Sequence, residues 1–518
     1  MSASNTYKVF WCPECNVPLL APTCSVCGGR GFYCAADLRP VFPLERRFLE
    51  GLLNIKLPRN IYYSLRRIIF EGRPILRFTV QAGKIRATMA DLPSNGVSNL
   101  SWGETKRRLI AANQEILSDL VSEAQGFIQR TYVEHHDREV FTSFSGGKDS
   151  VVVAWLVTEA LEGFGVTVPL FFADTTIELP DTYAYVDRMR QYFEIIVEKT
   201  DNDFYELCDI LDPPSRIIRW CCSLCKAYPL NKFLNRLTND ILAFDGIRRS
   251  ESNSRRDYPR IFQNPKAKRQ LAARPILHWP TLAVWLYIFD KGIPYNPAYL
   301  KGFGRVGCLH CPSNSNYDDL LVKTYYPRHY EKMAALLSKF AVDNDKGDPQ
   351  EFIEKEYWKR RKPASNDRIT VQVTEIRPNS FLYTFTKPIP REVTEFLKII
   401  GDIRIGINTF RTCTTNPMMI RGNVGGSELL VDLPEKRTYT RRKQVERQIE
   451  KALNCIACGG CLGKCPNGAL SISSSPTGAR RLVIDQNKCS HCLKCNTLRN
   501  CVVMSHKSGR VRIGQVSQ

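Results

Sequence analysis

The spacing of the cysteines restricts the fold of this chain more than any other feature of the sequence. At least sixteen of its twenty cysteines fall into close groups of the C-x-x-C kind. Thiols at this spacing favour metal ions or iron–sulfur clusters, whereas a chain of 518 residues would need many more cysteines to be held together by disulfides. We therefore expect reduced thiolates in several small metal-binding modules that are attached to larger domains.

The first cysteine group lies within residues 1–40. Two C-x-x-C pairs are separated by eight residues, and a tight turn in each pair directs both sulfurs at one ion. Four thiolates in this arrangement favour tetrahedral Zn²⁺ and predict a zinc ribbon, with a rubredoxin-like iron site or unmetallated thiols as the alternatives. The predicted zinc ligands are Cys12, Cys15, Cys24 and Cys27.

A glycine-rich loop stands near the start of a region, residues 138–340, in which strand-like and helix-like segments alternate. This alternation predicts an α/β domain with a parallel sheet. The loop follows a buried strand and precedes a helix, so that its backbone N–H groups, its lysine and its hydroxyls can hold phosphate oxygens. An ordinary strand-to-helix turn is the alternative. The loop reads Ser145-Gly146-Gly147-Lys148-Asp149-Ser150.

This hexapeptide resembles the PP-loop of the ATP pyrophosphatases, which hold the pyrophosphate of ATP while its α-phosphorus is attacked. The resemblance implies a PP-loop (adenine nucleotide alpha hydrolase-like) sheet core, and Asp174 resembles the acidic position that these enzymes place near the nucleotide. Arg248 and Arg249, in residues 246–251, resemble the arginine loop of the phosphoadenosine phosphosulfate (PAPS) reductase branch. Guanidinium groups also suit phosphate or sulfate oxygens on physical grounds, with a surface ion pair as the alternative for Arg248.

The second cysteine group lies inside the same region and resembles the [4Fe-4S] signature of adenylyl-sulfate (APS) reductases. The resemblance implies an iron–sulfur cluster beside the nucleotide pocket, and zinc is the rival because soft ligands alone do not choose the metal. It implies four cluster ligands, which are Cys221, Cys222, Cys308 and Cys311.

One sulfur of the second group is then spare. The family pattern leaves Cys225, whereas a cage built with Cys222 and Cys225 would release Cys221. A spare thiolate near Lys226 has a lowered pKa and can carry a persulfide or attack sulfur; the alternative is a buried, inert thiol. We assign Cys225 a catalytic role as the hypothesis to test.

The third cysteine group lies in residues 451–518 and resembles the bacterial ferredoxin with two [4Fe-4S] clusters. The second half departs from that pattern, because five residues precede its last cysteine and Val502 stands where proline is usual. Two structural zinc sites are the alternative. The crossover rule of the family implies one cluster on Cys455, Cys458, Cys461 and Cys501, and another on Cys465, Cys489, Cys492 and Cys495.

The rest of the chain divides into smaller units. We expect small α+β units at residues 41–100 and 341–435, a helical connector at 101–137, and a basic linker helix at 436–450, which is either solvated or in contact with phosphate. The formal charge of +21 falls to about +13 with one zinc site and three clusters, and it still favours an RNA or tRNA partner. No signal peptide or apolar membrane span is visible, so a cytoplasmic enzyme without membrane contact is expected.

Together these features favour an ATP-dependent, adenylating sulfur transferase that receives electrons from its own ferredoxin domain. Lys148 and Ser150 would bind the pyrophosphate of ATP, Arg248 would bind its phosphates, and Asp149 or Asp174 would bind Mg²⁺. The acceptor is RNA, tRNA or a small metabolite. APS or PAPS reduction with release of sulfite is the alternative, although those enzymes carry a Glu-Cys-Gly-Leu-His motif that this chain lacks and typically have no lysine in the loop. A second alternative is an electron-transfer or nucleic-acid-binding protein with a regulatory nucleotide pocket.

Overall fold

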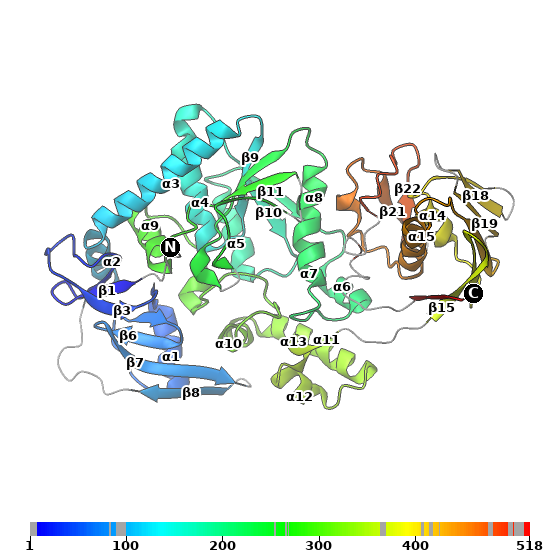
Figure 1. The fold of residues 1–518 in the computed structure, drawn as a ribbon. Helices are drawn as coiled ribbons and strands as arrows, with labels where there is room; N and C mark the ends of the chain where they lie inside the picture. Colours follow the sequence, from blue (N-terminus) through cyan, green and yellow to red (C-terminus); the bar gives the residue numbers. More distant parts are fainter. Residues whose placement is uncertain are drawn as a thin grey trace.

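Three lobes follow one another along the molecule in the computed structural model (Figure 1). The N-terminal lobe is blue in Figure 1, the central lobe is cyan to green, and the C-terminal lobe is yellow to red. No helix in the described part of the chain is long and apolar enough to cross a membrane. The described residues are 8–81, 84–89, 100–252, 255–264, 267, 269–362, 369–405, 409–413, 418–423, 425–474, 480–495, 501 and 512–517.

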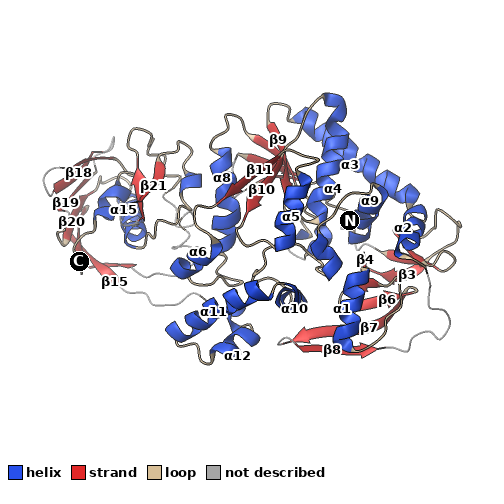
Figure 2. Cartoon of the chain, turned by 180° about the vertical axis from the view of Figure 1, so that it is seen from behind, coloured by secondary structure: helices blue, strands red, loops and turns tan. Residues whose placement is uncertain are grey.

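The N-terminal lobe contains two antiparallel sheets. The first has the strand order β2-β1-β3 and carries the first cysteine group, and the second has the order β4-β5-β6-β7-β8 and is covered on one face by α1 (Figure 2). The elements from α1 to β8 fall within residues 41–100, for which we expect a small α+β unit. The elements are β1 (Val9–Cys12), β2 (Val17–Leu19), β3 (Phe32–Ala35), β4 (Arg39–Pro40), α1 (Pro43–Leu53), β5 (Tyr62–Ser64), β6 (Arg67–Phe70), β7 (Arg73–Gln81) and β8 (Lys84–Met89).

Two helices connect this lobe to the central one, as the apolar spacing predicts: α2 (Trp102–Ala111) and α3 (Gln114–Glu134). Ser101 caps α2 by accepting a hydrogen bond from the backbone N–H of Glu104 at 3.2 Å. Asn113, between the helices, accepts from the backbone N–H of Leu20 at 2.7 Å and donates to the carbonyl of Pro18 at 2.9 Å. The connector therefore fixes the cysteine-bearing sheet to the central lobe.

The central lobe has the predicted α/β fold. Its sheet has the order β11-β10-β9-β12-β14-β13, in which every strand except β13 is parallel to its neighbours. The chain order reverses between β9 and β12, and ligands of such sheets bind at the carboxyl ends of the strands at this point. The strands are β9 (Glu139–Phe144), β10 (Leu170–Asp174), β11 (Ile195–Lys199), β12 (Ile241–Phe244), β13 (Ile261–Gln263) and β14 (Gln270–Ala273).

Helices surround this sheet and extend below it in Figure 1. Four of them lie below the central sheet in Figure 1, and the first contacts β7 of the N-terminal sheet: α10 (Asn316–Tyr325), α11 (Pro327–Asp343), α12 (Pro349–Glu354) and α13 (Tyr357–Arg360). The last two lie in residues that we expected in the α+β unit of residues 341–435, and α12 packs with α11. The others are α4 (Lys148–Leu161), α5 (Pro180–Met189), α6 (Phe204–Leu211), α7 (Trp220–Cys222), α8 (Tyr228–Leu234) and α9 (Thr281–Asp290).

The C-terminal lobe is built around a sheet of order β17-β18-β19-β20-β16-β15-β23. Its last strand, β23, lies parallel to β15, so residues that we expected in the cysteine-rich module complete the sheet of the preceding unit instead. The strands of this sheet are β15 (Ile369–Arg377), β16 (Ser380–Phe385), β17 (Asp402–Ile405), β18 (Thr409–Cys413), β19 (Met419–Asn423), β20 (Glu428–Asp432) and β23 (Arg512–Ser517).

The expected linker helix is α15 (Thr438–Leu453). It is not a solvated linker, because Val445 and Ile449 are fully buried and pack with α14 (Arg391–Leu397) in the core of the lobe. A short antiparallel hairpin of β21 (Leu470–Ser474) and β22 (Arg480–Ile484) lies within the cysteine-rich module.

Candidate functional site

The glycine-rich loop lies at the carboxyl end of β9 and leads directly into α4. Gly146 has a φ of +71°, and a Cβ there would lie 2.8 Å from Cγ2 of Thr182, so both the backbone conformation and the space require glycine. The Ser150 hydroxyl donates to the carbonyl of Gly147 at 2.9 Å and accepts from the backbone N–H of Ser145 at 3.2 Å. The loop is therefore a closed turn at a helix N-terminus, which is a favourable place for an anion.

Three buried charged side chains lie together at this loop. Nζ of Lys148 lies 2.8 Å from one carboxylate oxygen of Asp149, and Nε of Arg248 lies 2.6 Å from the other. Lys148 is only 4% exposed and Arg248 only 2%. Two cations share one carboxylate, so the cluster keeps a net positive charge where a phosphate group would be bound.

Burial and ion pairing act in opposite directions on these groups. Burial raises the pKa of Asp149, but the ion pairs with Arg248 and Lys148 outweigh it and hold the pKa at about 2. Burial lowers the pKa of Lys148, and Asp149 opposes that shift. Arg248 is also held by hydrogen bonds to the Ser250 hydroxyl at 2.8 Å and to the carbonyl of Trp279 at 3.2 Å. The guanidinium group is thus fixed before any ligand arrives.

Gly246 begins the arginine loop, and it was not among the predicted site residues. A Cβ there would lie 2.8 Å from the backbone carbonyl carbon and oxygen of Asp149, so the loop after β12 packs directly against the loop after β9. A glycine that follows a buried strand at such a position is the signal that was available in the sequence.

Two further residues position the loop without any sequence signal. The hydroxyl of Tyr299 accepts a hydrogen bond from the backbone N–H of Lys148 at 2.8 Å. The side-chain amide of Asn296 donates to the carbonyl of Gly146 at 3.1 Å and to the Thr182 hydroxyl at 3.0 Å. Both residues are about 150 positions away in the chain, and only the fold brings them to the loop.

Asp174 and Arg249 form hydrogen bonds with residues outside the glycine-rich loop. Asp174 ends β10, and its Oδ1 accepts from the backbone N–H of Thr176 at 2.7 Å and from the Tyr183 hydroxyl at 2.9 Å. Arg249 donates to the carbonyl of Tyr258 at 3.2 Å. Neither residue makes a contact with the charged cluster of Lys148, Asp149 and Arg248 among the hydrogen bonds and ion pairs seen in the described residues.

All five cysteines of the second group line one pocket at the same edge of the sheet. The pocket also contacts Thr175 and Ile177, which follow β10. The backbone N–H of Leu309 donates to the carbonyl of Ile177 at 2.8 Å, which holds the second C-x-x-C pair against this strand end. The cysteines are Cys221 and Cys222 on α7, Cys225 in the following turn of π-helix, and Cys308 and Cys311 in the loop before α10.

Cationic side chains line the same pocket, namely Arg219, Lys226 and Arg305. A hydrogen bond from the neighbouring Cys221 thiol lowers the pKa of Cys222 to about 5 against the effect of burial, and Arg219 adds to the shift by donating to the sulfur at 3.3 Å. Burial raises the pKa of Cys225, and Lys226 only partly opposes this, so the lowered pKa that we expected for a spare thiol at Cys225 is wrong. Five sulfurs with three cations form a donor set that fits an anionic cofactor held by four thiolates.

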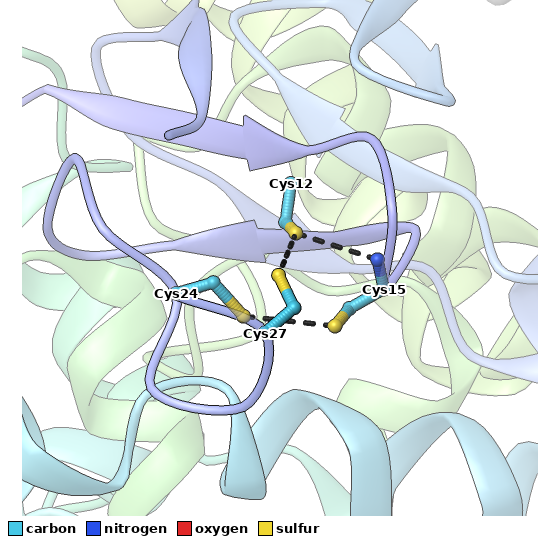
Figure 3. Close-up of side chains that lie close together, drawn as sticks. All are labelled: Cys12, Cys15, Cys24 and Cys27. Carbon is cyan, nitrogen blue, oxygen red and sulfur yellow. Dashed lines mark hydrogen bonds between the residues drawn. The ribbon is translucent and has the colours of Figure 1, made fainter. Parts of the chain in front are cut away.

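The first cysteine group converges on a single point (Figure 3). The sulfurs of Cys12 and Cys27 are 3.5 Å apart and those of Cys24 and Cys15 are 3.6 Å apart. The four sulfurs all lie within 4.8 Å of one another. Tetrahedral zinc with Zn–S bonds of about 2.3 Å would place its sulfurs about 3.8 Å apart, so this donor set fits zinc.

The eight cysteines of the third group line two separate pockets. One pocket also contains Lys451 and Leu482, and the other contains His491 and Ile399. The first pocket is lined by Cys455, Cys458, Cys461 and Cys501, and the second by Cys465, Cys489, Cys492 and Cys495. Each set combines cysteines from both halves of the module, and each donor set fits a four-thiolate cluster.

The cysteine-rich module packs against α8, the helix that continues from Cys225. An ideal Cβ built on Gly459 would lie 3.7 Å from the ring of Tyr228. An ideal Cβ built on Gly463 would lie 2.6 Å from Cβ of Asn231. The side-chain amide of Asn235 donates to the carbonyl of Cys465 at 3.3 Å. One short helix therefore lies between the second cysteine group and the third.

The central lobe thus combines a mixed, mainly parallel α/β sheet with a glycine-rich loop at its switch point, which is where α/β domains of this class bind their ligands. Residues 139–314 match the family model of the phosphoadenosine phosphosulfate reductase domain.

The chain is similar to several known proteins. An uncharacterized protein of Methanocaldococcus jannaschii is 35% identical over 253 residues, which are 48% of this chain and 52% of that protein. The adenosine 5'-phosphosulfate reductase of Bacillus cytotoxicus is 28% identical over 197 residues, which are 36% of this chain and 79% of that enzyme. The crystal structure of the PAPS reductase from Candida auris superposes with a TM-score of 0.30 at 19% identity over 42% of this chain and 99% of that chain. The chain spans about half the length of the first of these relatives.

Proposed function

We propose that this protein is an ATP-dependent, adenylating sulfur transferase that receives electrons from its own cysteine-rich module. The observation that supports this proposal best is the buried cluster of Lys148, Asp149 and Arg248 at the glycine-rich loop. A lysine and an arginine that are both fixed at a helix N-terminus suit the β- and γ-phosphates of an intact triphosphate.

In the first step an oxygen of the acceptor attacks the α-phosphorus of ATP, an acceptor–AMP ester forms and pyrophosphate leaves. Lys148, Ser150 and the loop amides hold the departing pyrophosphate, and Arg248 neutralises the charge that develops on it. Both carboxylate oxygens of Asp149 are engaged by cations, so Asp174 is the better Mg²⁺ ligand of the two candidates. In the second step reduced sulfur displaces AMP, and the acceptor carbon exchanges its C–O bond for a C–S bond.

The central pocket would hold a [4Fe-4S] cluster on Cys221, Cys222, Cys308 and Cys311. Among the described residues, the sulfurs of the first cysteine group all lie within 4.8 Å of one another, as a single metal ion requires. The sulfurs of the central group do not meet this limit, and their larger separation favours a cofactor larger than one ion. When bound, the cluster would supply an electron-transfer centre beside the nucleotide. Cys225 would be the spare thiol, loaded as a persulfide by exchange with an external persulfide donor, which leaves as its thiol. The terminal sulfur would displace AMP from the adenylated acceptor, and two electrons from the cysteine-rich module with two protons would then cleave the S–S bond to give the thiolated acceptor and the free Cys225 thiol.

The third cysteine group would hold two further clusters, and α8 would be the shortest protein path from them to the central pocket. The first group would hold a structural zinc ion, and the acceptor would be an RNA, with tRNA as the first candidate. Each of the three cysteine groups is thus assigned a different function in the proposed reaction or in the stability of the fold.

Anaerobic incubation of the purified protein with ATP, APS and PAPS separately tests the proposal. The incubations contain a persulfide donor, dithionite and tRNA, and pyrophosphate, AMP and sulfite are measured. Pyrophosphate and AMP formed in equal amounts from ATP, with no sulfite from APS or PAPS, are expected. Sulfite released from APS without consumption of ATP would establish sulfonucleotide reduction instead.

Sulfonucleotide reduction is the second candidate, because residues 139–314 match the PAPS reductase domain. ATP binding without release of pyrophosphate would point to the third candidate, an electron-transfer or nucleic-acid-binding protein whose pocket is regulatory.

A further inference from the structure

We propose that the solvent-exposed face of the N-terminal five-stranded sheet binds the phosphate backbone of an RNA. The face carries Arg67 on β6, Arg77 on β7 and Arg86 on β8, and these three residues are called the arginine face below. This inference deepens the proposed function, on which it rests for its choice of RNA, because it names the surface that would hold an RNA acceptor.

The strand register brings the three side chains together. Arg67 lies directly opposite Arg77 in the antiparallel pair of β6 and β7. Arg77 lies opposite Thr88 on β8, which makes Arg86 its diagonal neighbour on the same face. Directly opposed residues have Cβ atoms about 5 Å apart and diagonal neighbours about 7–8 Å, so the three guanidinium groups can reach successive phosphates of one strand.

Repulsion between the three arginines destabilises the sheet, and no acidic side chain in the described strands of the sheet offsets it. Like charges directly opposite each other on neighbouring strands are destabilising. None of the three arginines forms an ion pair within the described part of the chain, and residues 56–86 contain eight basic side chains and one acidic side chain, Glu71. A polyanion would supply the missing counter-charge.

The opposite face of this sheet is occupied. Ile68, Leu76 and Phe78 are buried there, and Phe78 packs edge-on against Tyr317 of α10 at a centroid distance of 5.4 Å. The side-chain amide of Asn316 donates to the carbonyl of Val80 at 3.0 Å. Since α10 begins five residues after Cys311, the sheet that carries the arginine face is fixed to the central cysteine pocket.

Exposed aromatic rings adjoin the same strands and favour RNA over other polyanions. Phe32 is 42% exposed and Tyr33 is 58% exposed, both on β3. The Phe32 ring covers Gly72, where a Cβ would come within 2.7 Å of it, and Gly72 directly precedes β7. Phe32 thus lies at the turn between β6 and β7, and Arg67 and Arg77 lie at the other end of the same hairpin. Arginines and accessible aromatic rings in one lobe suit an RNA with unpaired bases, which can stack on the rings, better than duplex DNA or a lipid surface.

Fluorescence anisotropy of the full-length protein with a labelled, unmodified tRNA transcript tests the inference over a range of salt concentrations and without ATP. The test variant combines Arg67→Gln, Arg77→Gln and Arg86→Gln. We expect affinity at about 150 mM salt to fall about tenfold or more, and the slope of log K against log salt to shrink by about 2 to 3.

The matched control removes the same charge elsewhere. It combines Arg107→Gln, Arg190→Gln and Lys355→Gln, because each of these exposed side chains pairs with an acidic residue of its own helix. We expect a change of less than about twofold. Equal losses in test variant and control would overturn the inference, and so would tighter binding to duplex DNA or anionic phospholipid vesicles than to the transcript.

Two measurements keep the result independent of folding and of the proposed reaction. The unfolding temperature of the triple variant is expected to stay the same or to rise, since repulsion is removed. Should the triple variant unfold, Arg77→Gln alone is expected to reduce the salt slope by about 1, and an unchanged slope would overturn the inference. Absence of pyrophosphate release would count against the proposed reaction, while RNA binding in the ATP-free assay would still stand.

Discussion

Gly463 of the cysteine-rich module lies so close to Asn231 of α8 that an ideal Cβ on the glycine would be 2.6 Å from Cβ of the asparagine. Real Cβ atoms do not approach this closely, so only glycine permits the observed contact. Because α8 follows Cys225, this contact sets the separation between the central cysteine pocket and the pocket of Cys458 and Cys461.

Gly463→Val is therefore expected to slow electron transfer from the module to the central pocket without loss of iron. The added side chain pushes the module away from α8, and electron transfer weakens with distance. Rapid-freeze EPR after addition of dithionite-reduced ferredoxin, with iron analysis, measures both quantities. Gly163→Val is the control, since an ideal Cβ on Gly163 meets nothing within 4 Å. An unchanged rate in Gly463→Val would contradict the assignment of α8 as the path.

Lys148→Met is expected to lower the rate of pyrophosphate release by about 10²- to 10³-fold, because one fixed cation no longer faces the charge that develops on the phosphates. The buried side chain has nearly the same length, so the fold is expected to persist. A radiolabelled pyrophosphate assay measures the effect. The control is Lys291→Met, which removes an exposed lysine that pairs with Glu159. Full activity in Lys148→Met would remove the main support for a triphosphate substrate.

The pH dependence of stability tests the ion pairs of Asp149. Burial raises the pKa of Asp149, and the ion pairs with Arg248 and Lys148 lower it by a larger amount. The resulting pKa is about 2, below the ordinary value of 3.8. Since the folded-state pKa is the lower one, the ion pairs stabilise the fold above about pH 4, and this stabilisation is lost as the pH falls toward 2.

We accordingly expect Asp149→Asn to unfold at a lower temperature than the natural protein at neutral pH, because two buried cations then face each other without a carboxylate. The difference is expected to narrow between about pH 4 and pH 2, as followed by circular dichroism on matched preparations of both proteins. A difference that stays constant over this range would show that Asp149 does not act through its charge.

Substitutions of two neighbouring thiols separate cluster binding from sulfur transfer. Cys222→Ser is expected to remove about four iron atoms per chain, since it deletes a proposed cluster ligand. Cys225→Ser is expected to keep that iron and to abolish sulfur incorporation into the acceptor. Iron analysis and incorporation of ³⁵S measure these outcomes. Loss of iron in Cys225→Ser with retention in Cys221→Ser would instead assign Cys221 as the spare thiol.

The first cysteine group is expected to hold about one zinc ion per chain, and Cys12→Ser to release it and lower the unfolding temperature of the N-terminal lobe. Metal analysis and differential scanning calorimetry measure the two effects. Cys34→Ser is the control, because Cys34 lies outside the four converging sulfurs. Equal zinc content in Cys12→Ser and the natural protein would contradict a zinc site there.

Local patterns predicted the central sheet and the place of the glycine-rich loop well. The apolar run Val140–Phe144, followed by Gly146 and Gly147, predicted both the strand β9 and the loop after it. A buried strand that is followed by glycines and a helix has few alternative structures. The short strand β14 carried no such signal, since its sequence Gln-Leu-Ala-Ala is not typical of a strand.

Contacts over long distances in the sequence could not be predicted in the same way. Tyr299 and Asn296 reach the loop from about 150 residues away, and no spacing rule connects them to Lys148. The basic stretch at the start of α15 is predicted to be either solvated or in contact with phosphate. The sequence did not predict that Val445 and Ile449, further along the same helix, are buried, because it does not place the apolar surface of the sheet beside them.

The pairing of β23 with β15 makes the cysteine-rich module an insertion whose two ends return to the same sheet. A stop codon before Cys455 would therefore not yield a clean truncation, because β15 would lose its outer neighbour and expose an open hydrogen-bonding edge that invites aggregation. Electron delivery is better tested by replacing the cysteine-rich segment with a short linker that keeps β23 in place. A truncated chain would lose the redox module and also damage the sheet of the C-terminal lobe, so the two effects could not be separated.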